Sequence, residues 1–180
     1  MSPYKQYPFQ FSVHIQKKKG AKVTHLEFLN TEQRDFREDF IKSLIEGCGD
    51  EGSIIIYNMS FEKQVNNRLA EDFPKYRKEL EKINERMVDL LIPFRSRYIY
   101  SPDQNGSAGL KSTFPAFVGD LYNKLEIKDG ATAQKQYMEF LQDKIDPADQ
   151  SKIFEDLLDY CELDTFAMVK LLEVLYQHQK

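Results

Sequence analysis

The sequence predicts one mixed-sheet α/β domain over residues 1–180. Two segments alternate apolar and polar residues, and two short runs are continuously apolar, as in strands. Between and after these predicted strands, apolar residues recur three or four positions apart, which is the spacing of helices. No glycine-rich phosphate loop follows any of the predicted strands, so we do not expect a doubly wound nucleotide-binding fold.

The first half of the chain alternates strands with one clear helix. Residues 9–13 have the period of a half-buried strand, and a polar turn at 17–20 leads to a second strand over 23–29. Apolar residues at helical spacing predict a helix over 36–45, ended by the glycines that follow. The continuous apolar run 54–57 is typical of a strand buried on both faces of a sheet.

The second half is mostly helical. Ser60 is placed to cap a helix, and a charge-rich helix is expected over 75–86. Residues 87–91 form another apolar strand candidate, and 102–109 have the composition of a loop. Asp146 followed by proline is the usual start of a helix, so we expect a long helix from there towards the end of the chain.

The composition excludes several classes of protein. The chain has 25 Lys and Arg residues and 29 Asp and Glu residues, which gives a net charge of −4. This charge excludes a generally basic nucleic-acid coat protein. No apolar run approaches the ~18 residues of a membrane-spanning helix, and no apolar leader begins the sequence. The two cysteines and three histidines show no metal-ligand spacing, which argues against a structural zinc site. We therefore expect a cytoplasmic location.

Tyr160 and Asp164 form the first candidate for chemistry. They are four positions apart and so share one face of the last predicted helix. A phenol one turn from a carboxylate can orient a water bound to a metal ion that the carboxylate holds. The alternative is an aromatic side chain packed beside a solvated aspartate, which this pattern by itself favours.

Glu62 is the second candidate, because it follows directly after a predicted buried strand at the start of a helix. Ligands collect at such strand ends in α/β sheets, and Mg²⁺ or Mn²⁺ prefers oxygen ligands of this kind. The alternative is that Glu62 only complements the dipole of the helix in its first turn.

Together the two segments resemble a known nuclease superfamily. Asn58-x-x-Phe61-Glu62 is similar to the second motif of the DnaQ-like (DEDDy) 3′–5′ exonucleases, and Tyr160-x-x-x-Asp164 is similar to the third. Further segments in order along nearly the whole chain resemble an uncharacterised bacterial domain family of that superfamily. These segments lie at Pro3-Tyr4, 8–12, 57–62, 86–90, 106–116, 129–130 and 160–168.

The resemblance implies a ribonuclease H-like fold, a mixed β-sheet flanked by helices. It implies that Glu62 and Asp164 bind Mg²⁺ or Mn²⁺ in a two-metal site and that Tyr160 orients the attacking water. It also implies that the chain acts on single-stranded DNA or RNA and releases nucleoside monophosphates. Family members are often fused behind a RecB-like nuclease domain, which is therefore an expected partner within a longer parent protein.

Two departures from the superfamily pattern matter. Glu62 stands where the second motif usually has aspartate, and its extra methylene shifts the carboxylate. The first motif, Asp-x-Glu on the central first strand, is absent and would precede Pro3, so we expect a truncated start and an incomplete metal site. Glu27 and Asp89 are weak substitutes, and Asp89 more simply caps a helix or orients a loop.

The absence of the central strand and of half the metal ligands has two expected consequences. Unpaired strand edges call for another strand, from this chain, a partner protein or a second copy, or else for a rearranged sheet. Little or no nuclease activity is expected from this chain alone.

A nucleic-acid surface is expected beside the metal site. Residues 94–100 alternate cations with aromatics, which suits the phosphates and stacked bases of a single strand. We assign this role to Arg95, Arg97 and Lys111, together with Asn58 and Phe61 of the second motif. The equally weighted alternative is a surface strand with solvated arginines.

Two rival functions remain open. A non-catalytic module could keep the same fold to bind nucleic acid or a partner protein. A metal-dependent phosphoesterase unrelated to polynucleotides could use the same acidic residues.

Overall fold

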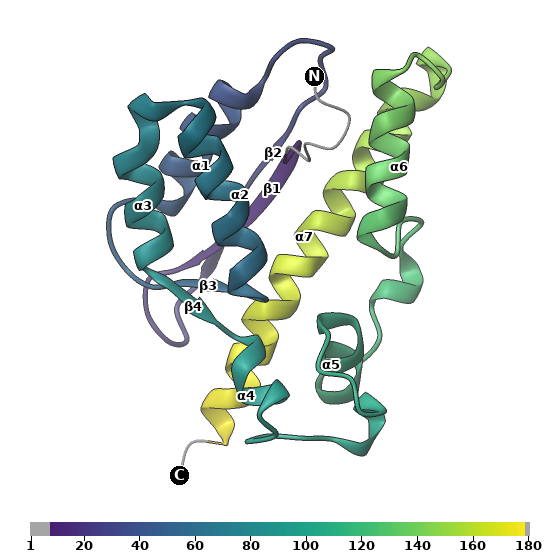
Figure 1. Ribbon diagram of the computed structural model, residues 1–180. Coiled ribbons are helices and arrows are strands. Elements are labelled where there is room, and N and C mark those ends of the chain that lie inside the picture. Colours follow the sequence, from purple (N-terminus) through teal and green to yellow (C-terminus); the bar gives the residue numbers. More distant parts are fainter. Residues whose placement is uncertain (1–7, 179–180) are drawn as a thin grey trace.

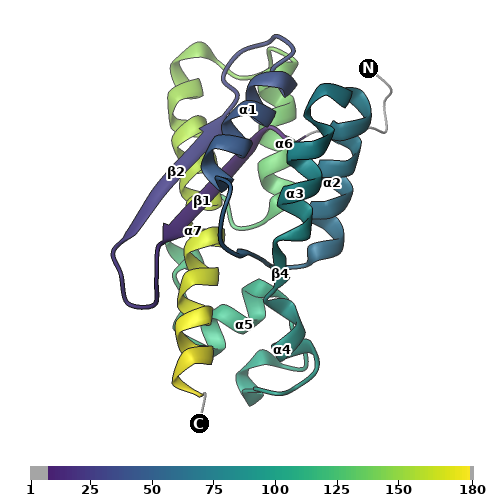
Figure 2. The ribbon, with the colours of Figure 1, turned by 90° about the vertical axis from the view of Figure 1, so that its left-hand side faces the viewer.

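Two pairs of strands lie between two groups of helices in the computed structural model, which describes residues 8–178 (Figure 1). Helices α1, α2 and α3 cover one side of the strands, and α5, α6 and α7 cover the other (Figures 1 and 2). The bounds are α1 Arg37–Cys48, α2 Met59–Asp72, α3 Arg77–Glu85, α4 Leu91–Arg95, α5 Leu110–Phe117, α6 Gly130–Leu141 and α7 Pro147–Gln177. The mixed α/β class is confirmed. The Pro3-Tyr4 segment lies outside the described residues.

Short 3₁₀ turns join several of these helices. They are η1 Pro74–Tyr76, η2 Pro102–Gln104 and η3 Tyr122–Lys124. None of the helices within residues 8–178 combines the length and the apolar character that crossing a bilayer requires.

The first strand pair is an antiparallel hairpin of β1 (Gln10–Gln16) and β2 (Val23–Leu29), as predicted. One face of β1 carries Phe11 and packs on α1 at Gly47. A Cβ atom at Gly47 would lie 3.6 Å from a ring carbon of Phe11. Gly47 therefore lies inside α1 rather than ending it, and Gly49, with φ 54°, follows the last residue of the helix.

The other face of β1, which the alternation predicted to be solvated, packs against α7. Ser12 is buried there and lies within hydrogen-bond distance of Thr165, whose hydroxyl is 2.7 Å away. The hairpin is thus covered on both faces, and its polar residues are shared with a helix from the far end of the chain.

The second pair is parallel and consists of β3 (Ile54–Ile56) and β4 (Met87–Asp89). Helices α2 and α3 form the crossover that parallel strands require. The predicted strands at both positions are confirmed, but only Ile56 of β3 is buried. The expectation of burial on both faces of β3 is therefore met only in part.

The prediction of one mixed sheet is wrong for the described residues, because the strands form two separate two-stranded sheets. The hairpin and the β3–β4 pair are not hydrogen-bonded to each other, and no fifth strand lies between them within residues 8–178. In the predicted ribonuclease H-like fold a central strand would join the two pairs.

Local signals set the starts of two helices that build the site. Asp146 accepts a hydrogen bond from the Ala148 amide at 2.9 Å, and α7 begins at Pro147 as predicted. Ser60 does not cap α2. Helix α2 begins at Met59, one residue before Ser60. The residue before the helix, Asn58, has a left-handed backbone conformation with φ 77°.

The apolar core has two clusters. One lies between α1, α2, α3 and the hairpin and contains Ile41, Leu69 and Leu80, none of which is exposed. The other surrounds α7 and contains Phe114 and Leu157. The ring of Phe9 contacts both clusters and so links the two sides of the molecule.

Replacing Leu69 by alanine should lower the free energy of unfolding by about 2–5 kcal/mol, because its side chain is completely buried and a cavity would remain. The matched control is Leu26→Ala on β2, whose residue is 46% exposed and whose loss should change stability by about 0.5 kcal/mol or less. Urea denaturation followed by circular dichroism measures both. Equal effects of the two changes would contradict the core assignment.

Candidate functional site

Tyr160 and Asp164 lie on the side of α7 that faces α5 and the η3 turn. The Tyr122 hydroxyl donates a hydrogen bond to Asp164 Oδ1 at 2.6 Å. Burial raises the pKa of Asp164, while hydrogen bonding from Tyr122, the charge of Lys111 and hydrogen bonding from Tyr160 act in the opposite direction. Asp164 is therefore a carboxylate held in place by phenols in a partly desolvated site.

The Tyr160 hydroxyl stays protonated in this site. Burial, followed by the charge of Asp164, raises the pKa of Tyr160 well above its usual range. The residue is 8% exposed. It can therefore act as a hydrogen-bond donor and orienting group, but not as a base at neutral pH.

Lys111, in the first turn of α5, places its ammonium group over both phenol rings. Lys111 Nζ lies 4.2 Å from the centroid of the Tyr160 ring and 4.6 Å from that of Tyr122. It also donates a hydrogen bond to the carbonyl oxygen of Lys128. Burial lowers the pKa of Lys111, and Asp164 and then Asp129 oppose this effect. A cation is thus fixed beside the Asp164 carboxylate.

The start of α6 borders the same site. Asp129 caps this helix by accepting hydrogen bonds from the amide and hydroxyl of Thr132, at 2.8 and 2.9 Å. A Cβ atom on Gly130 would lie 3.7 Å from the Tyr160 hydroxyl, an ordinary van der Waals distance, so the start of α6 lies beside this group. Sequence reasoning missed the contact of Tyr122 with Asp164, because no spacing or motif marks a residue that arrives from a separate turn.

Glu62 lies in the first turn of α2. Burial raises its pKa, and within residues 8–178 its carboxylate has no hydrogen bond or ion pair. Burial, and then the charges of Asp164, Glu62 and Glu27, raise the pKa of Cys161 to about 12. The charges of three carboxylates, one from α2, one from β2 and one from α7, thus act on one thiol.

Glu62 and Asp164 offer the oxygen donors that a hard divalent cation prefers, although no close group of three potential ligands among the described residues includes them. Glu62 is an acidic side chain that is largely withdrawn from water and lacks a cationic partner among the described residues. A bound Mg²⁺ or Mn²⁺ would neutralise it together with Asp164, and carboxylate oxygens are the ligands these ions prefer. The nearby Lys111 supplies one further positive charge.

Asp89, considered as a substitute ligand, has a different role. Its Oδ1 accepts hydrogen bonds from the amides of Asn58 and Leu91, at 3.0 and 2.9 Å, and its Oδ2 accepts one from Met59 at 2.9 Å. Asp89 therefore fixes the starts of α2 and α4, and the expectation that it orients a loop is confirmed.

A pocket of about 530 Å³ adjoins the site. It lies beside α4 and is lined in part by Asn58, Arg95, Arg97 and Tyr100. Its wall continues through Gly109 and Leu110, which directly precede Lys111 in the chain.

The two arginines of this pocket are exposed and form no ion pair among the described residues. The guanidinium carbon of Arg97 lies 5.7 Å from the centroid of the Tyr100 ring. Phe61 does not line the pocket, and this residue is 51% exposed on α2.

The family of the chain follows from comparison with known families. A family model described as a domain of unknown function (DUF2779) matches residues 1–109. This match covers more than half of the 180 residues, so the chain belongs to that family. No curated protein and no solved structure shows a significant match.

Glu62→Gln should stabilise the protein at neutral pH. The fold raises the pKa of Glu62, so the folded state binds this proton more tightly than the unfolded state does. Glu62 therefore contributes stability below its unfolded pKa and loses that contribution as the pH rises through the folded pKa. Melting temperatures should show Glu62→Gln above wild type at pH 7.5 and the difference shrinking below about pH 4.

Mn²⁺ should raise the melting temperature of wild type more than that of Glu62→Gln, because the ion relieves the buried charge. Glu81→Gln, at an exposed position on α3, is the matched control and should behave like wild type in both experiments. Destabilisation by Glu62→Gln at pH 7.5 would contradict this account of the carboxylate.

Proposed function

We propose that this DUF2779 chain forms most of a metal-dependent, DnaQ-like 3′–5′ exonuclease domain that acts on single-stranded DNA or RNA. The observation that carries the proposal is the Asp164 carboxylate on α7, which accepts a hydrogen bond from Tyr122 beside Tyr160 and the Lys111 ammonium group, while the charge of Glu62 acts on the neighbouring Cys161. Glu62, Tyr160 and Asp164 come from the two segments that resemble the second and third exonuclease motifs.

The arrangement of strands is compatible with a ribonuclease H-like sheet that lacks its central strand. In this reading the β1–β2 hairpin and the parallel β3–β4 pair are the two neighbours of that strand. The missing Asp-x-Glu motif would lie on it. A strand from a longer parent chain, from a partner or from a second copy would join the pairs and complete the site.

Substrate phosphates would bind along the cationic side of the site. The pocket beside α4 has the volume of a small-molecule site, and it carries Arg95 and Arg97 together with the aromatic ring of Tyr100. Its wall leads to Lys111, which stands next to Asp164. A single strand could thus place bases in the pocket and a phosphate at Lys111.

Each residue of the site then has a distinct role. Glu62 and Asp164 would hold the divalent cation, which when bound stabilises the attacking and leaving oxygens of phosphodiester hydrolysis. The Tyr122 hydroxyl fixes the orientation of Asp164. Tyr160, protonated at neutral pH, orients the attacking water by a hydrogen bond. Lys111 holds the phosphate, and the products are nucleoside monophosphates.

A binding function without catalysis is the second candidate. Within residues 8–178, the exonuclease motif segments contribute Glu62 and Asp164, whereas the superfamily site also uses the two acids of Asp-x-Glu. The pocket arginines do not depend on those acids. Nucleic-acid binding with weak hydrolysis is therefore the expected behaviour of this chain.

Asp164→Asn should weaken Mn²⁺ binding at least tenfold in calorimetry, because it removes the charge of one of two carboxylate ligands. It should also abolish the slow release of mononucleotides from a 3′-labelled single strand. Tyr160→Phe should reduce that release while leaving Mn²⁺ binding within about threefold of wild type. Asp159→Asn, at an exposed position on α7, is the matched control and should change neither.

Internal cleavage, degradation from the 5′ end, or release that survives in Asp164→Asn would overturn the exonuclease assignment. Single-strand binding without Mn²⁺ binding would favour the non-catalytic module.

The double variant Arg95→Gln/Arg97→Gln should weaken binding of a fluorescent single strand at least tenfold in anisotropy measurements. Each arginine that neutralises a phosphate contributes about 0.7 to the slope of log affinity against log salt, so removing both should reduce the slope by about 1.4. Arg77→Gln, at an exposed position on α3, removes one positive charge away from the pocket and should leave the slope unchanged. An unchanged slope in the double variant would contradict the assignment of Arg95 and Arg97 to the nucleic-acid surface.

A further inference from the structure

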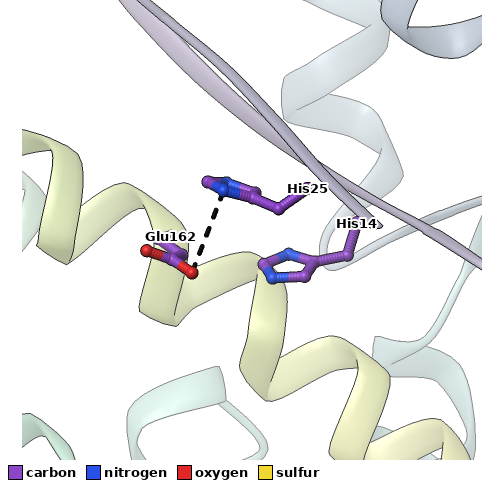
Figure 3. Close-up of side chains that lie close together, drawn as sticks. All are labelled: His14, His25 and Glu162. Carbon is purple, nitrogen blue, oxygen red and sulfur yellow. Dashed lines mark ion pairs between the residues drawn. The ribbon is translucent and has the colours of Figure 1, made fainter. Parts of the chain in front are cut away.

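His14 and His25 lie opposite each other in the hairpin, although their spacing in the sequence marks no shared site. The antiparallel register pairs them directly, and the centroids of their stacked rings are 4.7 Å apart. Both side chains lie on the hairpin face that α7 covers (Figure 3). The juxtaposition follows from strand pairing, which the sequence pattern does not specify residue by residue.

Helix α7 brings a carboxylate to the same two rings. His25 Nδ1 lies 3.9 Å from Glu162 Oε1, the contact dashed in Figure 3. One ligand atom from each of His14, His25 and Glu162 lies within 4.8 Å of the other two. Glu162 is half-exposed, so water and ions can reach the group.

Hydroxyl groups hold the other nitrogen of each ring. His14 Nδ1 is 2.8 Å from the Thr165 hydroxyl, and His25 Nε2 is 2.8 Å from the Ser12 hydroxyl. The two hydroxyls are 2.7 Å apart, and that of Thr165 also donates to the Glu162 carbonyl oxygen at 3.1 Å.

This hydroxyl network determines which ring atoms can bind a cation. In one arrangement both rings donate to the hydroxyls, and the Ser12 hydroxyl donates to that of Thr165. Each polar hydrogen of the network then has an acceptor. His14 Nε2 and His25 Nδ1 then carry free lone pairs. Metal-binding histidines characteristically have their second nitrogen held in this way.

We propose that His14, His25 and Glu162 bind one divalent cation of the zinc class, with a remaining position open to water. Two imidazoles and one carboxylate suit Zn²⁺, whereas the oxygen ligands Glu62 and Asp164 suit Mg²⁺ or Mn²⁺. Ligand atoms around tetrahedral zinc lie about 3.3 Å apart, given metal–ligand distances of about 2.0–2.1 Å. The half-exposed Glu162 side chain closes the remaining gap by a change of rotamer.

The bound ion would clamp the hairpin to α7. Glu162 is two residues from both Tyr160 and Asp164, which places it about 200° around the helix from each of them. The zinc-class site and the oxygen-ligand site therefore lie on opposite faces of α7. The clamp does not require nuclease activity, so each site can be tested separately.

An ion pair without metal is the competing explanation. A protonated His25 would be attracted to Glu162 on one side and to Glu27 on the other, each at 3.9 Å. Metal binding and protonation compete for the same lone pair, so direct measurement of metal binding distinguishes them.

Cobalt titration of the chelator-treated chain tests the proposal. Wild type should bind one Co²⁺ per chain at this nitrogen-containing site, distinct from any binding at the oxygen-ligand site, with visible absorption of a low-symmetry nitrogen and oxygen site and without the intense near-ultraviolet band of a thiolate ligand. Zn²⁺ should displace the Co²⁺ and raise the melting temperature. His14→Ala and His25→Ala should each weaken Co²⁺ binding at least 100-fold, and Thr165→Val about tenfold.

Three further variants complete the test. Glu162→Gln alters a half-exposed side chain without endangering the fold, and it should weaken Co²⁺ binding at least tenfold. His178→Ala removes the third histidine, at the end of α7, and should change nothing. Asp164→Asn removes the oxygen-ligand site and should leave Co²⁺ binding intact while Mn²⁺ binding is lost.

Absence of Co²⁺ binding by wild type would overturn the proposal. Undiminished binding by a folded His14→Ala or His25→Ala chain would also overturn it, as would an intense thiolate band. Failure of the nuclease assays would not affect these measurements.

Discussion

The packing of α7 against the β1–β2 hairpin is the constraint on which the other features depend. The helix carries Leu157 into the core, so its rotation about its own axis is fixed. That rotation turns Tyr160 and Asp164 towards α5 and turns Glu162 and Thr165 towards the hairpin. Both proposed sites are therefore set by one helix and one packing contact.

Desolvation of acidic groups gives the candidate site its chemical character. Burial raises the pKa values of Glu62 and Asp164, although Lys111 and hydrogen bonding from two phenols favour the charged form of Asp164. An arrangement that holds partly buried carboxylates together destabilises the fold at neutral pH. Such an arrangement is expected where a cation binds, because the ion recovers the lost solvation.

Much of the fold could be predicted because its signals are local. Alternation marked the strands of the hairpin, and Asp146 before proline marked the start of α7. The separation of the strands into two sheets was not predicted, because strand pairing depends on neighbours far along the chain. The polar face of β1 was predicted to face solvent for the same reason. No residue near Ser12 in the sequence indicates that α7 covers this face.

The sequence by itself determined the chemistry that is available: a phenol one helical turn from an aspartate, a glutamate after a buried strand, and arginines among aromatics. Residue identity and short-range periodicity are enough for these features. Only the tertiary structure decided which groups meet. Tyr122 reached Asp164, and the hairpin register and α7 brought two histidines to a carboxylate. Such meetings depend on packing between segments distant in the sequence, which no local pattern encodes.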